Sequence, residues 1–337
     1  MNLIPLIETS RGETPECWHF GAIAVTDLHG KLIAHAGNPD HLTFTRSTLK
    51  AIQALPFIQN KGHEFFNYQP KQLAMLCASH NGEDQHVEQA SLMLEKAGLD
   101  YKALKCGCHV PSIFATLEKA PPENLQYDER HNNCSGKHSG FVSYCVQHGH
   151  SLHDYIDPYH PLQIAIRKAV ADVAGLSENE LAMGVDGCSA PNYAMPLQNL
   201  ARSYARLASA SSNDVWGEHL APLRDAMISH PELVSGTARN DLLLTQVGRG
   251  DWVCKIGADG VQTIGSKSRG QALAIKISDG SKPALYTTTV ACLNQLGWIN
   301  DQQKQELEIL KAPNIINAAG KLVGKRYACF QLNLKPN

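Results

Sequence analysis

A serine and a lysine three positions apart, Ser47 and Lys50, are the first residues whose types and spacing could do chemistry. On a helix, residues three apart share one face, so these two side chains would be neighbours. A serine hydroxyl is a poor nucleophile until a base removes its proton. A lysine can be that base only if burial or a nearby cation lowers its pKa towards neutrality. The S-x-x-K pattern is common by chance, and taken alone it is better explained by a solvated helix.

Two further short motifs support a catalytic interpretation of that pair. Ser79-His80-Asn81 is an S-x-N at the exit of a buried apolar run, and Lys255-Ile256-Gly257 is a K-x-G at the end of a predicted strand. S-x-x-K, S-x-N and K-[TS]-G, in this order, mark the serine β-lactamases and penicillin-binding proteins. The second motif places a hydroxyl that can relay a proton. The third adds a cation that lowers the pKa of neighbouring groups and attracts an anionic substrate.

The sequence departs from the penicillin pattern at two positions. His80 stands where an aspartate is usual, and Ile256 stands where a hydroxylated residue is usual. A penicillin-interactive serine hydrolase is therefore an alternative function rather than the favoured one.

Two cysteines from separate segments, Cys134 and Cys188, could hold a soft divalent metal such as zinc. Spacing alone favours His138 as the third ligand, because imidazole is much commoner at zinc than an amine. Two unrelated buried cysteines explain the same residues. A second compact candidate for metal binding is the Cys106-Gly-Cys108-His109 segment. A non-catalytic zinc-binding protein built on Cys134 and Cys188 is thus another alternative function.

Arg239, in a polar loop, could bind a substrate carboxylate through its planar guanidinium. A solvated loop arginine is an equally good explanation of this residue.

Composition excludes several classes of protein. The chain has 337 residues, 18% charged residues and a formal net charge of −2, so it lacks the signature of a nucleic-acid-binding surface. No apolar run is long enough to cross a bilayer, and the first residues lack the pattern of a signal peptide. We therefore expect a cytoplasmic protein without membrane or nucleic-acid partners, whose ten cysteines are mostly reduced.

The elements that must position these residues follow from hydrophobic periodicity and turn signals. We expect an α+β fold in one domain over residues 1–337, with an antiparallel sheet built from both chain ends and helices packed on it. Residues 73–78 form a buried element of either type, and 106–133 form a long loop. Strands are expected at 19–26, 31–35, 181–185, 251–256, 261–264, 271–278 and 327–334, and helices at 84–97, 161–174, 197–210, 216–228 and 284–296.

Five blocks of the sequence together resemble one enzyme family. They are residues 46–50 (RSTLK), 78–83 (ASHNGE), 132–140 (NNCSGKHSG), 185–191 (VDGCSAP) and 255–260 (KIGADG). These blocks are similar to those of the Rhizobium etli-type, or class 3, L-asparaginases of the asparaginase II family. The resemblance covers nearly the whole chain and implies a fold like that of the serine β-lactamases, a homodimer, and hydrolysis of L-asparagine to aspartate and ammonia.

The resemblance also implies roles for individual residues. It pairs Ser47 with Lys50 and Ser79 with Lys255 as two catalytic tandems. It assigns zinc to Cys134, Lys137 and Cys188. It places His138 next to these residues rather than among the metal ligands.

Arg46, Asp186 and His138 are then expected around the substrate. On this interpretation Ser47 attacks the side-chain amide with neutral Lys50 as its base, and zinc modulates binding rather than supplying the nucleophile. Glutamine remains a possible substrate, because one methylene changes binding by only about 1–3 kcal/mol.

Overall fold

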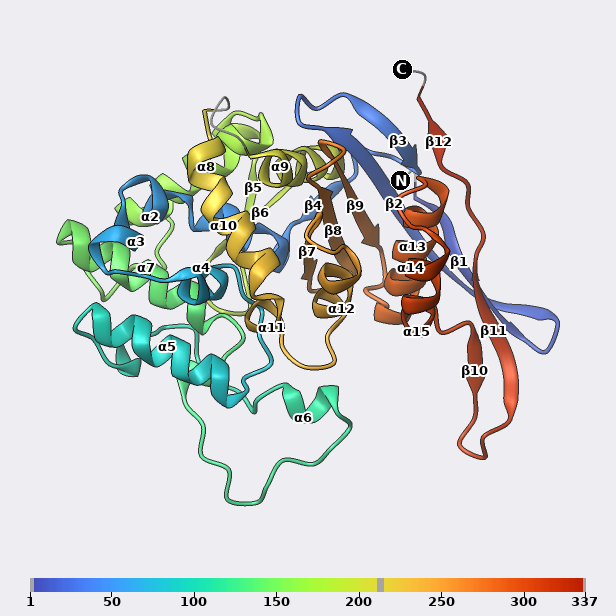
Figure 1. Ribbon diagram of the computed structural model, residues 1–337, viewed down its shortest axis with the longest axis horizontal. Helices are drawn as coiled ribbons and strands as arrows, with labels where there is room; N and C mark the ends of the chain where they lie inside the picture. The colour runs from blue at the N-terminus through green and yellow to red at the C-terminus, as the bar shows by residue number, and fades with distance from the viewer. Residues whose placement is uncertain (1–2, 211–214, 336–337) are drawn as a thin grey trace.

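The computed structural model describes residues 3–210 and 215–335 and forms an α+β fold, as predicted (Figure 1). Within these residues the main sheet has nine antiparallel strands in the order β10-β11-β1-β2-β9-β8-β7, with β3 paired to β2 and β12 paired to β3. The sheet is built from both chain ends, as expected. Its strands are β1 (Ile4–Arg11), β2 (Thr14–Asp27), β3 (Leu32–Ala36), β7 (Trp252–Gly257), β8 (Val261–Ser266), β9 (Gln271–Ile277), β10 (Asn314–Ile316), β11 (Leu322–Ala328) and β12 (Asn333–Leu334).

The two faces of this sheet carry side chains of different size. Strand side chains alternate between faces, and on β9 the large residues Leu273 and Ile275 point to one face while Ala272 and Ala274 point to the other. The alanine face lets helix α9 (Leu197–Ser209) approach closely. A Cβ at Gly265 would lie 2.6 Å from the Tyr204 carbonyl oxygen of this helix. Two hydrophobic cores result, one on each side of the sheet.

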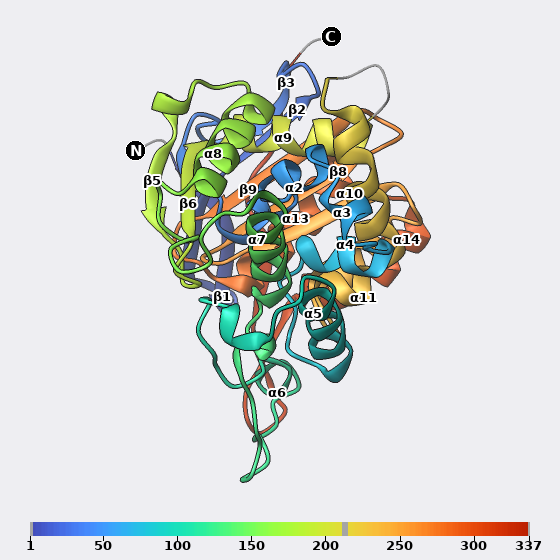
Figure 2. The ribbon, with the colours of Figure 1, turned by 90° about the vertical axis from the view of Figure 1, so that its left-hand side faces the viewer.

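Helices cover both faces, in a large group and a small one. The helix on the alanine face is α9, and the large group lies around it, whereas α13 to α15 cover the other face (Figures 1 and 2). The helices used below are η1 (Arg46–Leu49), α1 (Lys50–Gln53), α4 (Pro70–Leu76), α5 (Asp84–Lys96), α7 (Ser135–His148), α8 (Pro161–Ala174), α9 (Leu197–Ser209), α10 (Gly217–Ser229), α11 (Pro231–Val234), α12 (Asn240–Val247), α13 (Lys282–Gln295), α14 (Asp301–Glu306) and α15 (Glu308–Lys311).

Some elements differ from the sequence prediction. Strand β1 was not expected, and the predicted strand 327–334 is divided between β11 and β12. A second sheet, β4-β6-β5, was expected only in part; its strands are β4 (Leu42–Phe44), β5 (Ala182–Val185) and β6 (Pro191–Pro196). Strand β4 is short and pairs with β6, which is remote from it in sequence, so local patterning contains little information about β4. The buried run at 73–78 is mostly helix α4.

None of the helices in the described part of the chain combines the length and apolarity that a membrane crossing requires.

Candidate active site

Ser47 lies in the short 3₁₀ turn η1, which leads directly into helix α1 at Lys50. The start of the turn is fixed because Thr45 donates from both its backbone N–H and its Oγ1 to the Tyr193 carbonyl oxygen, at 3.0 and 2.9 Å. In a 3₁₀ turn, residues i and i+3 lie one above the other. The predicted pair therefore stays on one face, with Ser47 half-buried and Lys50 only 1% exposed.

The amine of Lys50 contacts Ser79 and two backbone carbonyls. Its Nζ lies 2.9 Å from Ser79 Oγ and 3.1 Å from the Asn133 carbonyl oxygen, and it also donates to the Ala78 carbonyl oxygen. A lysine ammonium has three N–H donors, so these three acceptors match it completely. These three contacts fix the position of the Lys50 amine beside Ser79.

The turn after α4 holds Ser79 and His80 in the interior. The Ser79 N–H donates to the Val234 carbonyl oxygen at 2.8 Å. His80 Nδ1 accepts from the Gly82 N–H at 3.2 Å, while its Nε2 lies 2.9 Å from Ser135 Oγ. Burial, helped by neighbouring positive charges, holds the pKa of His80 well below its usual range. His80 is thus a neutral residue that supports the turn.

Lys255 is a buried residue of β7, and its side chain points to the face of the sheet that η1 covers. Gly257 shares this face, and a Cβ at Gly257 would lie 2.9 Å from the Thr45 carbonyl oxygen. The Nζ of Lys255 lies 3.6 Å from Asp241 Oδ2. Burial lowers the pKa of Lys255 to about 7, the charge of Lys50 adds to the shift, and Asp241 opposes it. Lys255 is therefore an amine that can lose its proton near neutral pH.

Arg46 is held between two carboxylates. Its Nε donates to Asp186 Oδ1 at 2.8 Å, and its Nη1 donates to Asp259 in the turn between β7 and β8. Its backbone has a φ of 48°, a conformation that is uncommon outside glycine and that turns the side chain towards these partners. The three residues line a hollow of about 370 Å³, together with Leu42, Thr43, Phe44, Gly184, Val185, Asn192, Ala258 and Lys276.

The predicted metal ligands form one buried group. Lys137 Nζ lies 3.0 Å from Cys188 Sγ, and both Cys134 and Cys188 are buried. A hydrogen bond from Cys134, followed by the charge of Lys137, holds the pKa of Cys188 far below its usual range, although burial opposes this shift. Two sulfurs and an amine thus converge from α7, the residue before it and the loop between β5 and β6.

His138 lies behind this group and is fully buried. The Tyr155 hydroxyl accepts from the Lys105 N–H at 2.7 Å and lies 2.7 Å from His138 Nδ1. The hydroxyl proton therefore goes to Nδ1, which leaves the imidazole proton on Nε2, a buried atom that has no hydrogen-bond partner among the described residues.

The other metal candidates receive no support from the geometry. Within residues 3–210 and 215–335, no three histidine, cysteine, aspartate or glutamate residues are grouped so that they could hold a metal ion. Cys106 is buried with its Sγ 3.5 Å from the Glu129 carbonyl oxygen, whereas Cys108 is exposed. The prediction of a site at Cys106, Cys108 and His109 is therefore wrong, because adjacent residues in this loop point in different directions.

Three residues of this region escaped the sequence interpretation. Asp241 contacts Lys255, Asp259 contacts Arg46, and the Asn192 Oδ1 accepts from the Arg46 N–H at 3.0 Å. The sequence around Asp259 predicts only a turn, because Asp259 is part of an Asp-Gly pair. Asp241 and Asn192 could not be identified from the sequence, because their partners are remote in the chain.

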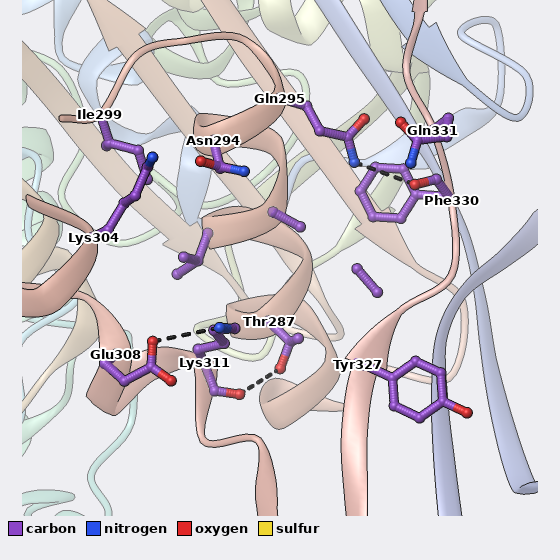
Figure 3. A pocket seen from close by; sticks show the side chains of 13 residues that line it. Thr287, Asn294, Gln295, Ile299, Lys304, Glu308, Lys311, Tyr327, Phe330 and Gln331 are labelled. Atoms are coloured by element: carbon purple, nitrogen blue, oxygen red, sulfur yellow. Dashed lines mark hydrogen bonds and ion pairs between the residues drawn. The ribbon is translucent and has the colours of Figure 1, made fainter. Parts of the chain in front are cut away.

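A second hollow, of about 380 Å³, lies among α13, α14, α15 and the segment that follows β11 (Figure 3). Several of its polar groups are occupied by structural contacts. Gln295 donates to the Phe330 carbonyl oxygen at 3.2 Å, Thr287 donates to the Lys311 carbonyl oxygen at 3.0 Å, and Lys311 pairs with Glu308. None of the predicted site residues lines this hollow.

Comparisons with known proteins give one strong match and several distant ones. A family model described as L-asparaginase II matches residues 7–328. No curated protein compared with the chain matches it. A β-lactamase structure from Mycobacterium bovis is 14% identical with a TM-score of 0.42, covering 82% of this chain and 94% of its own. A Bacteroides dorei protein proposed to be a β-lactamase is 12% identical with a TM-score of 0.40, covering 81% and 93%. At these TM-scores the two likenesses carry no conclusion about this chain.

Proposed function

The chain belongs to the L-asparaginase II family, and on this premise we propose that it is an amidohydrolase that converts L-asparagine to L-aspartate and ammonia. The observation that supports this best is the arrangement of two serines and two buried lysines. Ser47 is half-buried, Ser79 lies 2.9 Å from Lys50 Nζ, and Lys255 has a pKa of about 7. Acyl transfer needs these parts: a nucleophile, an amine that can accept a proton, and a fixed positive charge.

In the proposed reaction Ser47 Oγ attacks the side-chain amide carbon of asparagine. We assign the base to Lys255 rather than Lys50, because Lys255 is the amine with a lowered pKa while Lys50 is matched by three acceptors. Lys255 takes the Ser47 proton and returns it, through Ser79, to the departing nitrogen, so that ammonia leaves and an ester on Ser47 remains. Water then cleaves this ester, and the same groups return a proton to Ser47.

We also propose a zinc ion bound by Cys134, Lys137 and Cys188. Two buried sulfurs and an amine are a donor set that suits zinc, and Lys137 Nζ already lies 3.0 Å from Cys188 Sγ. Lys137 would have to lose its proton to become a ligand. When bound, zinc would supply a Lewis acid that orients the α-amino and α-carboxylate groups of the substrate. Arg46 and Asp186 stay the predicted substrate residues, and His138 would support Cys188.

The direct test is ammonia release from asparagine by the wild type and by Ser47→Ala. We expect the loss of activity to be at least ~10³-fold, because no other side chain replaces the attacking oxygen. The melting temperature should stay within a few degrees, since Ser47 is half-buried and its hydroxyl has no recorded partner in the described residues. Ser268→Ala, at an exposed turn, is the matched control and should keep full activity.

The same assay separates the alternatives. Retained turnover by Ser47→Ala would contradict the assigned nucleophile. Acylation by a labelled β-lactam without ammonia release would favour the penicillin-interactive hydrolase. Zinc binding without any amidase activity would favour the non-catalytic protein. Parallel assays with glutamine, with and without a chelator, measure the substrate preference and the need for metal.

A further inference from the structure

Arg239 differs from the other arginines around the site because its guanidinium has no partner. Its side chain is half-buried, and it makes no hydrogen bond or ion pair with any residue in 3–210 or 215–335. Arg46, by contrast, is paired with Asp186 and Asp259. A guanidinium whose N–H donors have no acceptor among the described residues can bind an anion through its planar fork.

The loop that carries Arg239 is fixed to the Ser79 turn. The Ser79 N–H donates to the Val234 carbonyl oxygen at 2.8 Å, and the Thr237 N–H donates to Glu83 Oε1 at 2.8 Å. The Asn81 side-chain amide donates to the Thr237 carbonyl oxygen at 3.1 Å. Three bonds from one turn thus hold the loop immediately before Arg239.

The other end of the loop is fixed to Lys255. Arg239 is the N-cap residue of α12, and Asp241, two residues later, is buried against Lys255 and accepts from the Ile256 N–H at 2.8 Å. The positive charge of Arg239 contributes to lowering the pKa of Lys255 on β7 and the pKa of His80 in the Ser79 turn. The loop that carries Arg239 therefore lies between the Ser79 turn and β7, close to the proposed reacting groups.

The charges in this region add to the case for an anionic ligand. Lys50 Nζ contacts three oxygen acceptors, and Asp241 is already engaged by the backbone of β7 and by Gln262. Asparagine carries one full negative charge, on its α-carboxylate, and a guanidinium can bind a carboxylate through two parallel hydrogen bonds. Of Arg46 and Arg239, Arg239 is the one whose donors have no acceptor within residues 3–210 and 215–335.

We propose that Arg239 binds the α-carboxylate of the amino-acid substrate and so determines the requirement for it, while Arg46 lines the substrate hollow with its guanidinium paired to Asp186 and Asp259. This inference rests on the proposed amidase function and deepens it. It assigns the substrate class as α-amino acids with a side-chain amide and a free carboxylate. A neutral α-amide in place of the carboxylate would leave Arg239 without its partner.

The test compares L-asparagine with L-asparaginamide, in which a neutral amide replaces the α-carboxylate, in the wild type, Arg239→Gln and Arg239→Lys. For Arg239→Gln we expect KM for asparagine to rise about 10- to 100-fold with kcat changed only a few-fold, because a charge-assisted contact is lost from ground state and transition state alike. The rise with Arg239→Lys should be smaller, since the charge stays while the planar fork is lost. For asparaginamide, Arg239→Gln should match the wild type.

The comparison of the Arg239 variants needs a defined pH, a measurable response to asparaginamide and a control variant. Removing the charge of Arg239 raises the pKa of Lys255, so the comparison is made on the alkaline plateau of each pH profile. If asparaginamide is turned over too slowly to follow, its Ki against asparagine hydrolysis gives the same comparison. Arg249→Gln, which removes an exposed pair with Glu306, is the matched control and should leave KM unchanged.

The outcomes distinguish this inference from the proposed function. If the wild type does not release ammonia from asparagine, the proposed function fails. If it does, but Arg239→Gln leaves KM for asparagine within about two-fold, or weakens asparagine and asparaginamide equally, the role of Arg239 is overturned. Removing an unpaired cation should not lower the melting temperature, so a large drop would show a structural role instead.

Discussion

The two buried lysines of this site have different immediate surroundings. Lys50 Nζ has three oxygen acceptors, whereas Lys255 Nζ has the Ile256 carbonyl oxygen at 3.1 Å and a carboxylate of Asp241 at 3.6 Å. Burial outweighs that carboxylate and brings the pKa of Lys255 to about 7. We therefore propose that the lysine of the third motif is the proton acceptor, while the lysine of the first motif holds Ser79 in place.

The pH dependence of activity tests this division of roles. Because the neutral form of Lys255 is the base, kcat/KM should rise with pH through an apparent pKa of about 7. Asp241 favours the protonated amine, so Asp241→Asn should move this rise to lower pH. Lys255→Arg, which stays charged, should be inactive at every pH. An unmoved profile in a folded Asp241→Asn variant would contradict the assignment.

The zinc proposal is tested by metal content and thermal unfolding, independently of activity. The wild type should bind about one zinc per chain, and its melting temperature should rise when zinc is added, because binding to the folded state stabilises it. Cys188→Ser and Cys134→Ser should lose both effects. Cys17→Ser, at an exposed cysteine, is the matched control. Unchanged zinc content in the Cys188 variant would exclude this residue as a ligand.

At the scale of elements, the site exists because η1 packs against the end of β7. Gly257 permits this contact, since a Cβ there would come within 2.9 Å of the Thr45 carbonyl oxygen and 3.3 Å of Arg46 Cβ. The turn carries Ser47 and the strand carries Lys255, so the distance between nucleophile and base depends on this packing.

Gly257→Ala should therefore separate the two elements. We expect kcat to fall about 10²-fold, because a shift of ~1 Å at a reacting pair is enough for such a loss. The free energy of unfolding should decrease by about 1–3 kcal/mol, the usual cost of overpacking. Kinetics and denaturant unfolding measure the two effects. A variant with wild-type kcat would show that the contact does not position Ser47.

At the scale of the whole molecule, the small sheet β4-β6-β5 presents the exposed apolar surface nearest to the site. Leu42, Phe44, Met183 and Val185 are each at least 45% exposed, and β5 is an edge strand of that sheet within the described residues. Exposed apolar groups beside an open strand edge are typical of association surfaces. The homodimer implied by the family resemblance stays a prediction, as does the cytoplasmic location, and this sheet is where we expect a second copy to bind.

Light scattering tests the predicted dimer. The wild type should have a molar mass of twice 36.8 kDa. Met183→Lys should shift the protein towards the monomer, because a charge replaces an apolar contact on β5. Ile309→Lys, at an exposed apolar residue of α15, should leave the mass unchanged. Dissociation by Ile309→Lys instead would place the interface on the opposite side of the molecule.

The sequence by itself determined the α+β class, the family and most of the long elements. Helix α8 has the predicted bounds, and α5, α9 and β9 agree within one or two residues, because hydrophobic periodicity and caps are local properties. It also identified the residue types of the site, since motif spacing is local too.

Only the tertiary structure decided which of these residues meet and in which charge state. The contact of Lys50 with Ser79, the carboxylates of Asp241 and Asp259, and the free guanidinium of Arg239 all join segments remote in sequence. Charge state follows from burial and from neighbouring charges, and both are properties of the packed molecule. The chemistry of the site is therefore encoded locally, and its electrostatics are set by the fold.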